Sequence, residues 1–294
     1  MSTAGNPLHP SNIIKQAAFW GVHLGCALVL MVGFSWTAFW VCTALYVVRM
    51  FGITGVYHRY FSHRSYKTSR VFQFALAFLG ATSAQKGPIW WSSHHRHHHQ
   101  FSDTEEDIHP PGIYGLWWAH VGWVLSTQFV GTRYELVKDL MKFPELRWLD
   151  KYHLLPPVLL IAGVTYLGYF LEAHYPELGT SAFQMFVWGF CISTTLLYHG
   201  TFCINSLTHM IGKRRFVTGD DSRNSLILAL ITLGEGWHNN HHRYPGSERQ
   251  GFYWWEIDIA HYTLKVLSWF GLVWDLREPP ARIYQEALET KIAA

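Results

Sequence analysis

Charged residues are scarce in this chain of 294 residues: Asp, Glu, Lys and Arg together make up 15% of it. Ordinary soluble domains carry roughly 25% charged residues, so the shortage argues against a disordered chain and is atypical of a soluble protein. Hydrophobic residues reach 49% and aromatic residues 17%, which is typical of a protein with much surface at a bilayer interface. The net charge of +3 and the lack of a basic arm argue against nucleic-acid binding.

Cysteine is also rare, and the four cysteines form no pattern. Cys26, Cys42, Cys191 and Cys203 all lie in apolar stretches, and no two of them are spaced as CxxC. The sequence therefore indicates neither a disulfide framework nor a cysteine-based zinc site. We interpret these cysteines as small buried residues.

Long segments without any charge mark the expected membrane helices. Residues 16–48 contain no Asp, Glu, Lys or Arg. As a helix this segment would extend about 50 Å, whereas one membrane span needs about 20 residues. We therefore expect a helical hairpin over 17–34 and 37–57, with its turn near 33–35. Residues 154–171 and 182–204 are free of charge as well and predict a second hairpin over 154–173 and 182–204.

The distribution of basic residues predicts how these spans are oriented. Lys and Arg gather in 58–151 and after 205, whereas the loop 172–181 has two acids and no base. The positive-inside rule then places both polar segments and both chain ends in the cytoplasm. The expected fold is an all-α membrane protein forming a single domain over 1–294. Four transmembrane helices in two hairpins lie under a cytosolic helical cap built from 58–151 and 205–294. We expect the shorter apolar stretches 71–84 and 113–130 to be interfacial or cap helices.

The abundance of histidine is the strongest functional signal, because 19 His stand against 20 Asp plus Glu. Three clusters stand out: HRYFSH at 58–63, HHRHHH at 94–99 and HNNHH at 238–242. The last two contain HxxHH, and positions i, i+3 and i+4 share one face of a helix. Three imidazoles would then project together from each helix, as metal ligation requires. A further pair, Asn205 and His209, has i, i+4 spacing at the end of the fourth span.

These clusters also have a less specific interpretation, since a histidine-rich tract can be a surface feature that scavenges metal. All three clusters are predicted on one side of the membrane next to apolar segments, which favours one shared internal metal site. About nine good ligands suit two metals of four or five ligands each, and imidazole suits Zn, Cu, Fe and Ni. Neutral imidazoles leave the metal charge uncompensated. We therefore expect supporting carboxylates from residues 103–107, Glu235 and the Asp220-Asp221 pair.

Five motifs together resemble those of the integral-membrane fatty-acyl desaturases, specifically the stearoyl-CoA (Δ9) branch. They are GITGVYHRYFSH (52–63), HRHHHQFSDT (95–104), HVGW (120–123), NSLTH (205–209) and LGEGWHNNHH (233–242). The resemblance implies an O₂-dependent desaturase that introduces a cis double bond, at Δ9, into a saturated acyl chain. It also implies two iron ions held by histidines, O₂ as co-substrate, and an external ferredoxin-like or cytochrome b5-like electron donor. The fatty-acyl substrate would be carried on CoA or on a membrane phospholipid.

The resemblance also assigns individual residues. One iron would take His58, His63, His95, His99 and His241, and the other would take His98, His209, His238 and His242. Asn205 would reach one metal through water. Gln85, Trp91 and Thr201 match the residues that surround the bend of the acyl chain in the family, and the far end of the tunnel would lie near Tyr46 and Met50. His94 and His97 are additions that we interpret as supporting or surface residues, and His109, His120 and His199 are weaker candidates for a supporting role.

The sequence differs from the family pattern where the family holds the CoA head group. Ser93-His94 stands in place of an Arg-Asp pair, Lys86 in place of an Asn, and Thr127-Gln128 in place of an Arg-Lys pair. Because phosphates normally call for Arg or Lys, a membrane-lipid acyl chain is an alternative to an acyl-CoA. Two other functions stay open at this point. One is a hydroxylase or decarboxylase on the same scaffold, and the other is a membrane metal carrier or store.

Overall fold

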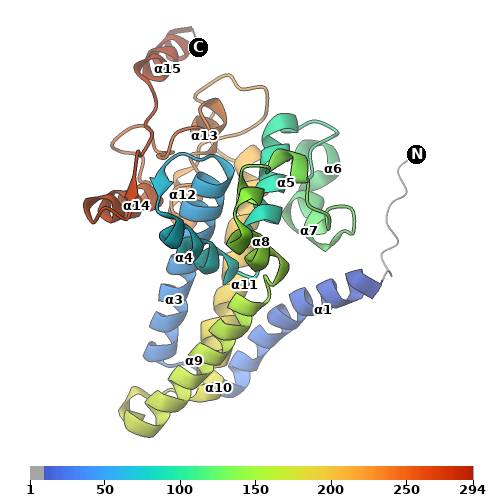
Figure 1. Cartoon of the computed structure of the whole chain (residues 1–294), viewed down its shortest axis with the longest axis vertical. Coiled ribbons are helices and arrows are strands. Elements are labelled where there is room, and N and C mark those ends of the chain that lie inside the picture. The colour runs from blue at the N-terminus through green and yellow to red at the C-terminus, as the bar shows by residue number, and fades with distance from the viewer. Residues whose placement is uncertain (1–9, 294) are drawn as a thin grey trace.

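The computed structural model describes residues 10–293, with side chains for residues 16–287, and is almost entirely helical. Long helices form an elongated lower part, and shorter ones form a cap above them (Figure 1). The lower part contains α1 (Pro10–Gly25), η1 (Cys26–Leu28), α2 (Val29–Val32), α3 (Trp36–Phe51), α9 (Leu155–His174), η6 (Pro176–Leu178), α10 (Ala182–Phe186), η7 (Val187–Ile192) and α11 (Ser193–Asn205).

The cap is assembled from segments far apart in the sequence. Its first half contains η2 (Gly52–Ser62), β1 (Lys67–Thr68), α4 (Arg70–Ala81), α5 (Pro88–Phe101), α6 (Pro111–Trp117), η3 (Trp118–Gly122), α7 (Trp123–Leu125), η4 (Tyr134–Leu136), η5 (Leu140–Lys142) and α8 (Pro144–Lys151). Its second half contains η8 (Leu207–His209), α12 (Leu226–Ile231), α13 (His238–Arg243), α14 (Ile259–Trp269), β2 (Val273–Trp274) and α15 (Ala281–Ala293). The strands β1 and β2 pair antiparallel, with Lys67 opposite Trp274, and so join the two halves.

Three helices within the described residues are long and apolar enough to cross a membrane: Trp36–Ser62, Leu155–His174 and Ala182–His209. They correspond to the predicted spans 37–57, 154–173 and 182–204. The predicted span 17–34 corresponds to an apolar helical stretch, Gln16–Val32, of 17 residues, which is shorter than the other three. The stretch predicted at 71–84 is the short helix α4. The stretch predicted at 113–130 contains α6, η3 and α7, and Gly115, whose φ is +82°, kinks the chain within α6.

The first hairpin turns where the sequence predicts it. Helix α2 ends before Gly33, whose φ of +65° lies in the region that favours glycine. The hydroxyl of Ser35 then accepts a hydrogen bond from the Ala38 N–H and caps α3. The same hydroxyl donates to the Gln184 side chain at 2.8 Å, so the turn is fastened to the start of α10.

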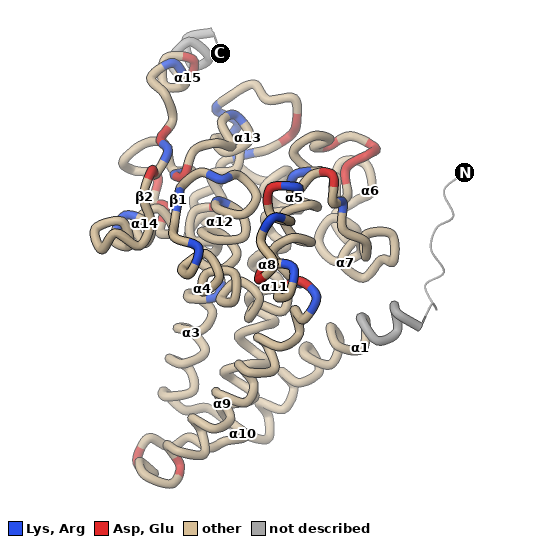
Figure 2. The backbone as a smooth tube through the Cα atoms, in the orientation of Figure 1, with Lys and Arg blue, Asp and Glu red and all other residues tan. Residues whose placement is uncertain are grey.

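The second hairpin is packed closely at its turn. A Cβ atom added to Gly168 on α9 would lie 2.6 Å from the carbonyl oxygen of Ser181, just before α10. A glycine is therefore required for α9 and α10 to approach so closely. Figure 2 shows that charged residues concentrate in the cap, while the helices below it are almost free of charge.

The membrane helices and the cap share one continuous core. Helix α3 runs without a break into the π-helical segment η2, so the first histidine motif stands directly above a predicted span. Every residue of η2 is buried, and the main apolar cluster joins η2 to α4, α5, α8 and α14. His58 is therefore fixed by packing on all sides, and His63 directly follows the buried segment.

Candidate metal centre

The structure brings nine histidines together in two groups deep in the cap. The nitrogen atoms within each group lie within 4.8 Å of one another. The first group contains His58, His63, His95, His99 and His241, and the second contains His98, His209, His238 and His242. This is the division that the sequence analysis expects. Helices α5 and α13 each contribute to both groups because the HxxHH spacing turns its histidines toward two neighbouring points.

The imidazole nitrogens face one another in a way that suits a cation between them. The Nε2 atom of His241 lies 3.0 Å from the Nε2 of His58 and 2.9 Å from the Nε2 of His99. The Nε2 atoms of His63 and His95 are 2.8 Å apart. One ring nitrogen carries at most one hydrogen, so such convergent contacts cannot all be hydrogen bonds. Lone pairs that meet at one point fit a metal that imidazole binds well.

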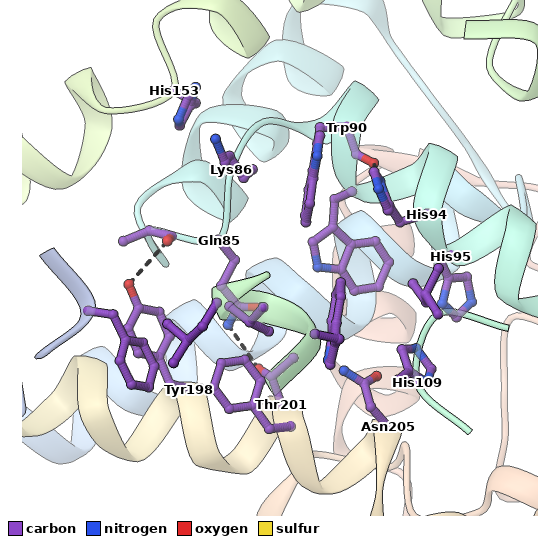
Figure 3. Close-up of a pocket in the computed structure, with 18 of the residues that line it drawn as sticks. Gln85, Lys86, Trp90, His94, His95, His109, His153, Tyr198, Thr201 and Asn205 are labelled. Carbon is purple, nitrogen blue, oxygen red and sulfur yellow. Dashed lines mark hydrogen bonds between the residues drawn. The ribbon is translucent and has the colours of Figure 1, made fainter. Parts of the chain in front are cut away.

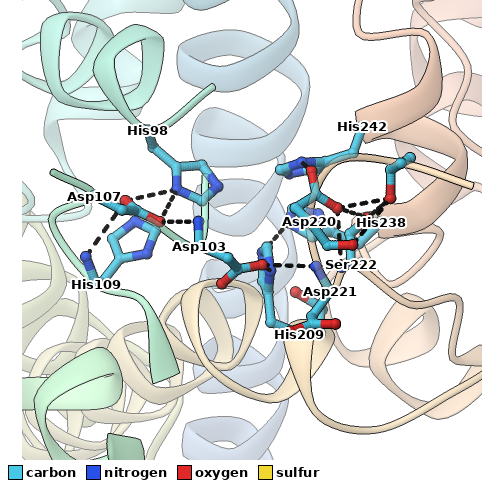
Figure 4. Close-up of polar contacts among 12 residues, drawn as sticks. His98, Asp103, Asp107, His109, His209, Asp220, Asp221, Ser222, His238 and His242 are labelled. Carbon is cyan, nitrogen blue, oxygen red and sulfur yellow. Dashed lines mark hydrogen bonds and ion pairs between the residues drawn. The ribbon is translucent and has the colours of Figure 1, made fainter. Parts of the chain in front are cut away.

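Four carboxylates hold the outer nitrogens of these histidines. Asp107 lies 2.9 Å from the Nδ1 of His98, and Asp103 lies 2.7 Å from the Nδ1 of His209 (Figure 4). Asp220 lies 2.6 Å from the Nδ1 of His242, and Glu235 lies 2.5 Å from the Nδ1 of His58. Each carboxylate fixes the tautomer in which Nε2 is left free to bind a metal. Among the described residues, the buried Nε2 of His242 has no hydrogen-bond partner.

All four carboxylates come from the acidic segments that the sequence analysis predicts, but not every acid in those segments contacts a histidine. Asp221 forms an ion pair with Arg214 at 3.3 Å instead, and Glu105 and Glu106 are exposed. The role expected of these segments is therefore met only by the carboxylates that lie beside the histidine helices.

Burial favours the uncharged form of several of these histidine rings, whereas Asp107 raises the pKa of His98. Burial lowers the pKa of His95, His99 and His241 well below the usual value, and the neighbouring histidines lower it further. The pKa of His242 falls to about 4, because burial outweighs the opposing effect of Asp220. Neutral imidazole is the form that binds a metal, so the site is prepared for a cation at neutral pH.

Two arginines, Arg59, which is buried, and Arg96, which is half-buried, tie the histidine segments to the rest of the cap, and the sequence analysis missed both. The guanidinium of Arg59 lies 3.1 Å from Glu235 and 2.9 Å from Asp258, which ties η2 to the start of α14. Arg96 donates to the carbonyl oxygens of Phe61 and Ser62 at 2.8 and 2.9 Å and pairs with Asp139 at 2.7 Å. It therefore ties α5 to the end of η2. The sequence feature that could have pointed to Arg96 is its position as the one residue in HHRHHH that is not a histidine.

The other predicted histidines lie outside the two groups. The Nδ1 of His94 is 2.9 Å from the carbonyl oxygen of Trp90, and His97 donates to the carbonyl oxygen of Glu106 at 2.8 Å. The ring of His109 lies 4.4 Å from that of His98, tilted against it, and His109 forms a third cluster of possible ligand atoms with His98 and Asp107. His120 and His199 contact each other and His23, away from both groups.

A cavity of about 390 Å³ runs beside the first group. Figure 3 shows Lys86 and His153 at one end, and His95, His109 and Asn205 at the other. Gln85, Trp91 and Thr201, the predicted bend residues, all line it. The Gln85 amide donates to the Thr201 hydroxyl at 3.0 Å, and Trp91 stacks on His95 at 5.1 Å. The rest of the lining is mostly apolar, as an acyl chain requires.

The backbone around Gln85 is held in a strained form. Ala84 and Lys86 have φ values of +57° and +71°, which cost non-glycine residues free energy and cluster at functional sites. The hydroxyl of Tyr198 donates to the Ala84 carbonyl, and that of Tyr57 donates to the Lys86 carbonyl. Two tyrosines from different membrane helices therefore hold this strained segment against the cavity.

Tyr46 and Met50, the predicted tunnel end, do not line this cavity. Both pack on Gly200, where an added Cβ would lie 2.7 Å from the Met50 Cε and 2.8 Å from the Tyr46 hydroxyl. Gly200 directly precedes Thr201. Tyr46 and Met50 therefore pack on the residue next to Thr201 in the sequence and lie outside the cavity lining.

The family model for fatty acid desaturases matches residues 34–272 of this chain. The chain belongs to the fatty acid desaturase family. It is 38% identical over 266 residues to the acyl-CoA C20 Delta5-desaturase of Anemone leveillei, covering 88% of this chain and 80% of the relative. It is 37% identical to Delta-9 acyl-lipid desaturase 2 of Arabidopsis thaliana, covering 90% of this chain and 83% of the relative. It is 34% identical to the sn-1 stearoyl-lipid 9-desaturase of Anabaena variabilis, covering 90% of this chain and 94% of the relative.

These matches establish the chain as an oxidoreductase, a fatty-acyl desaturase similar to enzymes that act on acyl-CoA and on acyl lipids. With its apolar helices it is a membrane protein. The histidine groups stand where such an enzyme needs a metal. The resemblance stated from the sequence is thereby confirmed.

Proposed function

We propose that this desaturase introduces a cis double bond at Δ9 into a saturated acyl chain, with two iron ions in the two histidine groups and O₂ as co-substrate. The observation that carries the proposal is the junction between the first group and the apolar cavity. His95 belongs to both, and Trp91 stacks on it. An acyl chain in the cavity would thus pass beside the metal ligands.

The iron ions, when bound, would supply the oxidising power that an unactivated C–H bond needs. The protein supplies the placement. Glu235, Asp103, Asp107 and Asp220 would hold the ligand rings. Gln85 and Thr201 would fix the bend of the chain, and the apolar lining would exclude water. Asn205 lies at the metal end of the cavity, where a water could join it to the second ion.

The position of the double bond would depend on how far the chain enters. The similar enzymes carry Delta5 and Delta9 in their names, so the family alone leaves the position open. We propose Δ9 because the five sequence motifs resemble that branch, and we place the closed end of the tunnel near Tyr46 and Met50.

The acyl carrier would be a membrane lipid or CoA, and the location of the cavity favours a membrane lipid. The exposed lining residues Ala18 and Leu154 stand in α1 and next to the start of α9. Both helices belong to the predicted membrane bundle, so an acyl chain could enter from the bilayer. Lys86, at the same end, has no ion-pair partner among the described residues and would meet an anionic head group.

We propose a multi-pass topology with four spans, the shorter helical stretch Gln16–Val32 being the first. A span can be as short as about 17 residues. The cap and the active site would face the cytoplasm, because the basic residues lie there (Figure 2). Residues 1–9 and 294 lie outside the described residues. The cytoplasmic location expected for both chain ends therefore rests on the sequence.

Fatty-acid profiling of cells that express the chain tests the proposed function. A new cis-Δ9 monoene in the membrane lipids is the expected result. An alcohol or a terminal alkene would indicate a hydroxylase or decarboxylase instead. The variant His95→Ala should form no product, and the variant His97→Ala, whose ring lies outside both groups, is the matched control. Loss of product in both variants would contradict the assignment of the site.

A further inference from the structure

The proposed reaction needs electrons from outside the chain. A CH₂–CH₂ unit, O₂, two electrons and two protons give CH=CH and two water molecules. The sequence contains no cysteine cluster and no dinucleotide-binding motif. A one-electron carrier protein must therefore dock where a short path leads to the histidine groups.

Two of the carboxylates that hold the second histidine group reach the surface of the cap, although most of its rings are buried. Its partners Asp103 and Asp220 have side chains that are 12% and 9% exposed. Glu235, which holds His58 in the first group, is only 1% exposed. The edge next to His209 and His242 is therefore connected to the surface through these two carboxylates.

One loop, residues 210–223, covers that edge, and it connects directly to the ligands. Asp220 holds His242, and the backbone N–H of Asp221 donates to Asp103 at 2.8 Å, which in turn holds His209. The exposed residue Asp221 is thus two hydrogen bonds away from His209 (Figure 4). The loop is fixed in place because the N–H groups of Arg215 and Phe216 donate to Asn239 on α13.

The outer face of this loop has the character of an interface. Met210, Ile211 and Val217 are 47%, 54% and 79% exposed, although they are apolar. Lys213 and Arg214 beside them are exposed as well. Lipid does not explain these apolar residues, because α13 lies at the opposite end of the molecule from the turn between α9 and α10 (Figure 1). An apolar centre with a charged rim is typical of a protein-binding surface.

The charges of the loop indicate the kind of partner. Residues 210–223 contain Lys213, Arg214, Arg215 and Arg223 against Asp220 and Asp221. Asp220 faces His242, Asp221 pairs with Arg214, and Glu256 pairs with Arg215, so Lys213 and Arg223 are left without an ion-pair partner among the described residues. A second copy of this chain would present the same positive charges and be repelled. An acidic partner is favoured, because opposite potentials speed association.

We propose that loop 210–223 is the docking surface for a small acidic one-electron carrier protein, and that electrons enter through the group that contains His209 and His242. This inference rests on the proposed function. Val217 would stand at the centre of the contact and Lys213 at its rim. From this surface, electrons would reach His209 along the two hydrogen bonds that join Asp221 to Asp103 and Asp103 to His209.

The test uses the full iron-loaded chain in phosphatidylcholine vesicles with two acidic donors, a [2Fe–2S] ferredoxin and the soluble domain of cytochrome b5. Lys213→Glu should raise the donor concentration for half-maximal turnover about tenfold and weaken its dependence on salt, with little change at saturating donor. Lys213→Gln should have an intermediate effect, and Val217→Glu should act in the same direction as Lys213→Glu. Lys265→Glu, on the exposed face of α14, is the matched control. Iron content should be equal in all variants.

Reduction by dithionite, a small molecule that needs no docking, distinguishes a defect in donor docking from a defect in the desaturation reaction itself. Single turnover with dithionite should be the same in wild type and in the Lys213 variants. An unchanged donor requirement in Lys213→Glu, or an equal change in Lys265→Glu, would overturn the docking surface. A wild-type chain that forms no alkene with any reductant would overturn the proposed function and this inference with it.

Discussion

Glu235 Oε2 lies 2.5 Å from the Nδ1 atom of His58, so the third histidine motif supports the first across 177 residues of sequence. The same carboxylate binds the Arg59 guanidinium at 3.1 Å and the Gln250 amide at 2.7 Å. It therefore sets the ring of His58 and also neutralises a buried cation. One residue joins the metal site to the core of the cap.

Replacing Glu235 with Gln should weaken the first metal site without removing a ligand. The amide keeps the shape but loses the charge that holds the His58 N–H, and losses of this kind cost roughly 10–100-fold in metal affinity or activity. Iron per chain and desaturation rate are the measurements. Equal iron content and rate in Glu235→Gln and wild type would contradict a supporting role for this carboxylate.

Replacing a histidine inside the groups should have a far larger effect than replacing one outside them. His241→Ala removes a ring that faces both His58 and His99, so we expect no desaturation and less bound iron. His97→Ala removes only a contact to the Glu106 carbonyl and should keep most of the activity. Equal losses in the two variants, with equal amounts of folded protein, would show that the grouping does not determine function.

The convergence of the histidines could be predicted from the sequence because the relevant order is local, whereas their division into two groups was implied by the family resemblance. HxxHH spacing on a helix places three rings on one face whatever the surrounding fold is, and α5 and α13 obey this rule. The hairpin turn at Gly33 and Ser35 was predictable for the same reason, because a glycine and a helix cap act on their immediate neighbours.

The roles of Arg59 and Arg96 could not be predicted, because they depend on contacts between distant segments. Arg59 meets Asp258 across 199 residues, and nothing in its local sequence indicates that it is buried. Arg96 depends on the carbonyl oxygens left free where η2 ends, which is known only once that end is placed. The position of Tyr46 and Met50 outside the cavity lining likewise depends on how α3 packs on Gly200.

Iron binding in the first group should vary little with pH until the solution is clearly acidic, whereas in the second group Asp107 raises the pKa of His98, so protons compete with the metal at a higher pH. Burial lowers the pKa of His95, His99 and His241 well below 6.5 and that of His242 to about 4. These rings stay neutral above their folded pKa, and only below it do protons compete with the metal. Iron retained after dialysis between pH 8 and pH 4 is the measurement. Loss of all the iron with a midpoint near pH 6.5 would mean that the first group titrates like free histidines.

Replacing Met50 with Ala should shift the preferred substrate toward longer acyl chains. The Met50 side chain is fully buried and meets Gly200, next to Thr201 in the cavity wall. Its removal would open space beyond the bend, and each additional buried CH₂ contributes about 0.8 kcal/mol, close to a fourfold preference. Product chain lengths from a mixture of saturated substrates are the measurement.

Met185→Ala, which removes an equally buried methionine from α10, is the control for a general loss of packing. It should lower stability in the same way but leave the chain-length profile unchanged. If Met50→Ala and wild type give the same profile, the tunnel does not end at Met50.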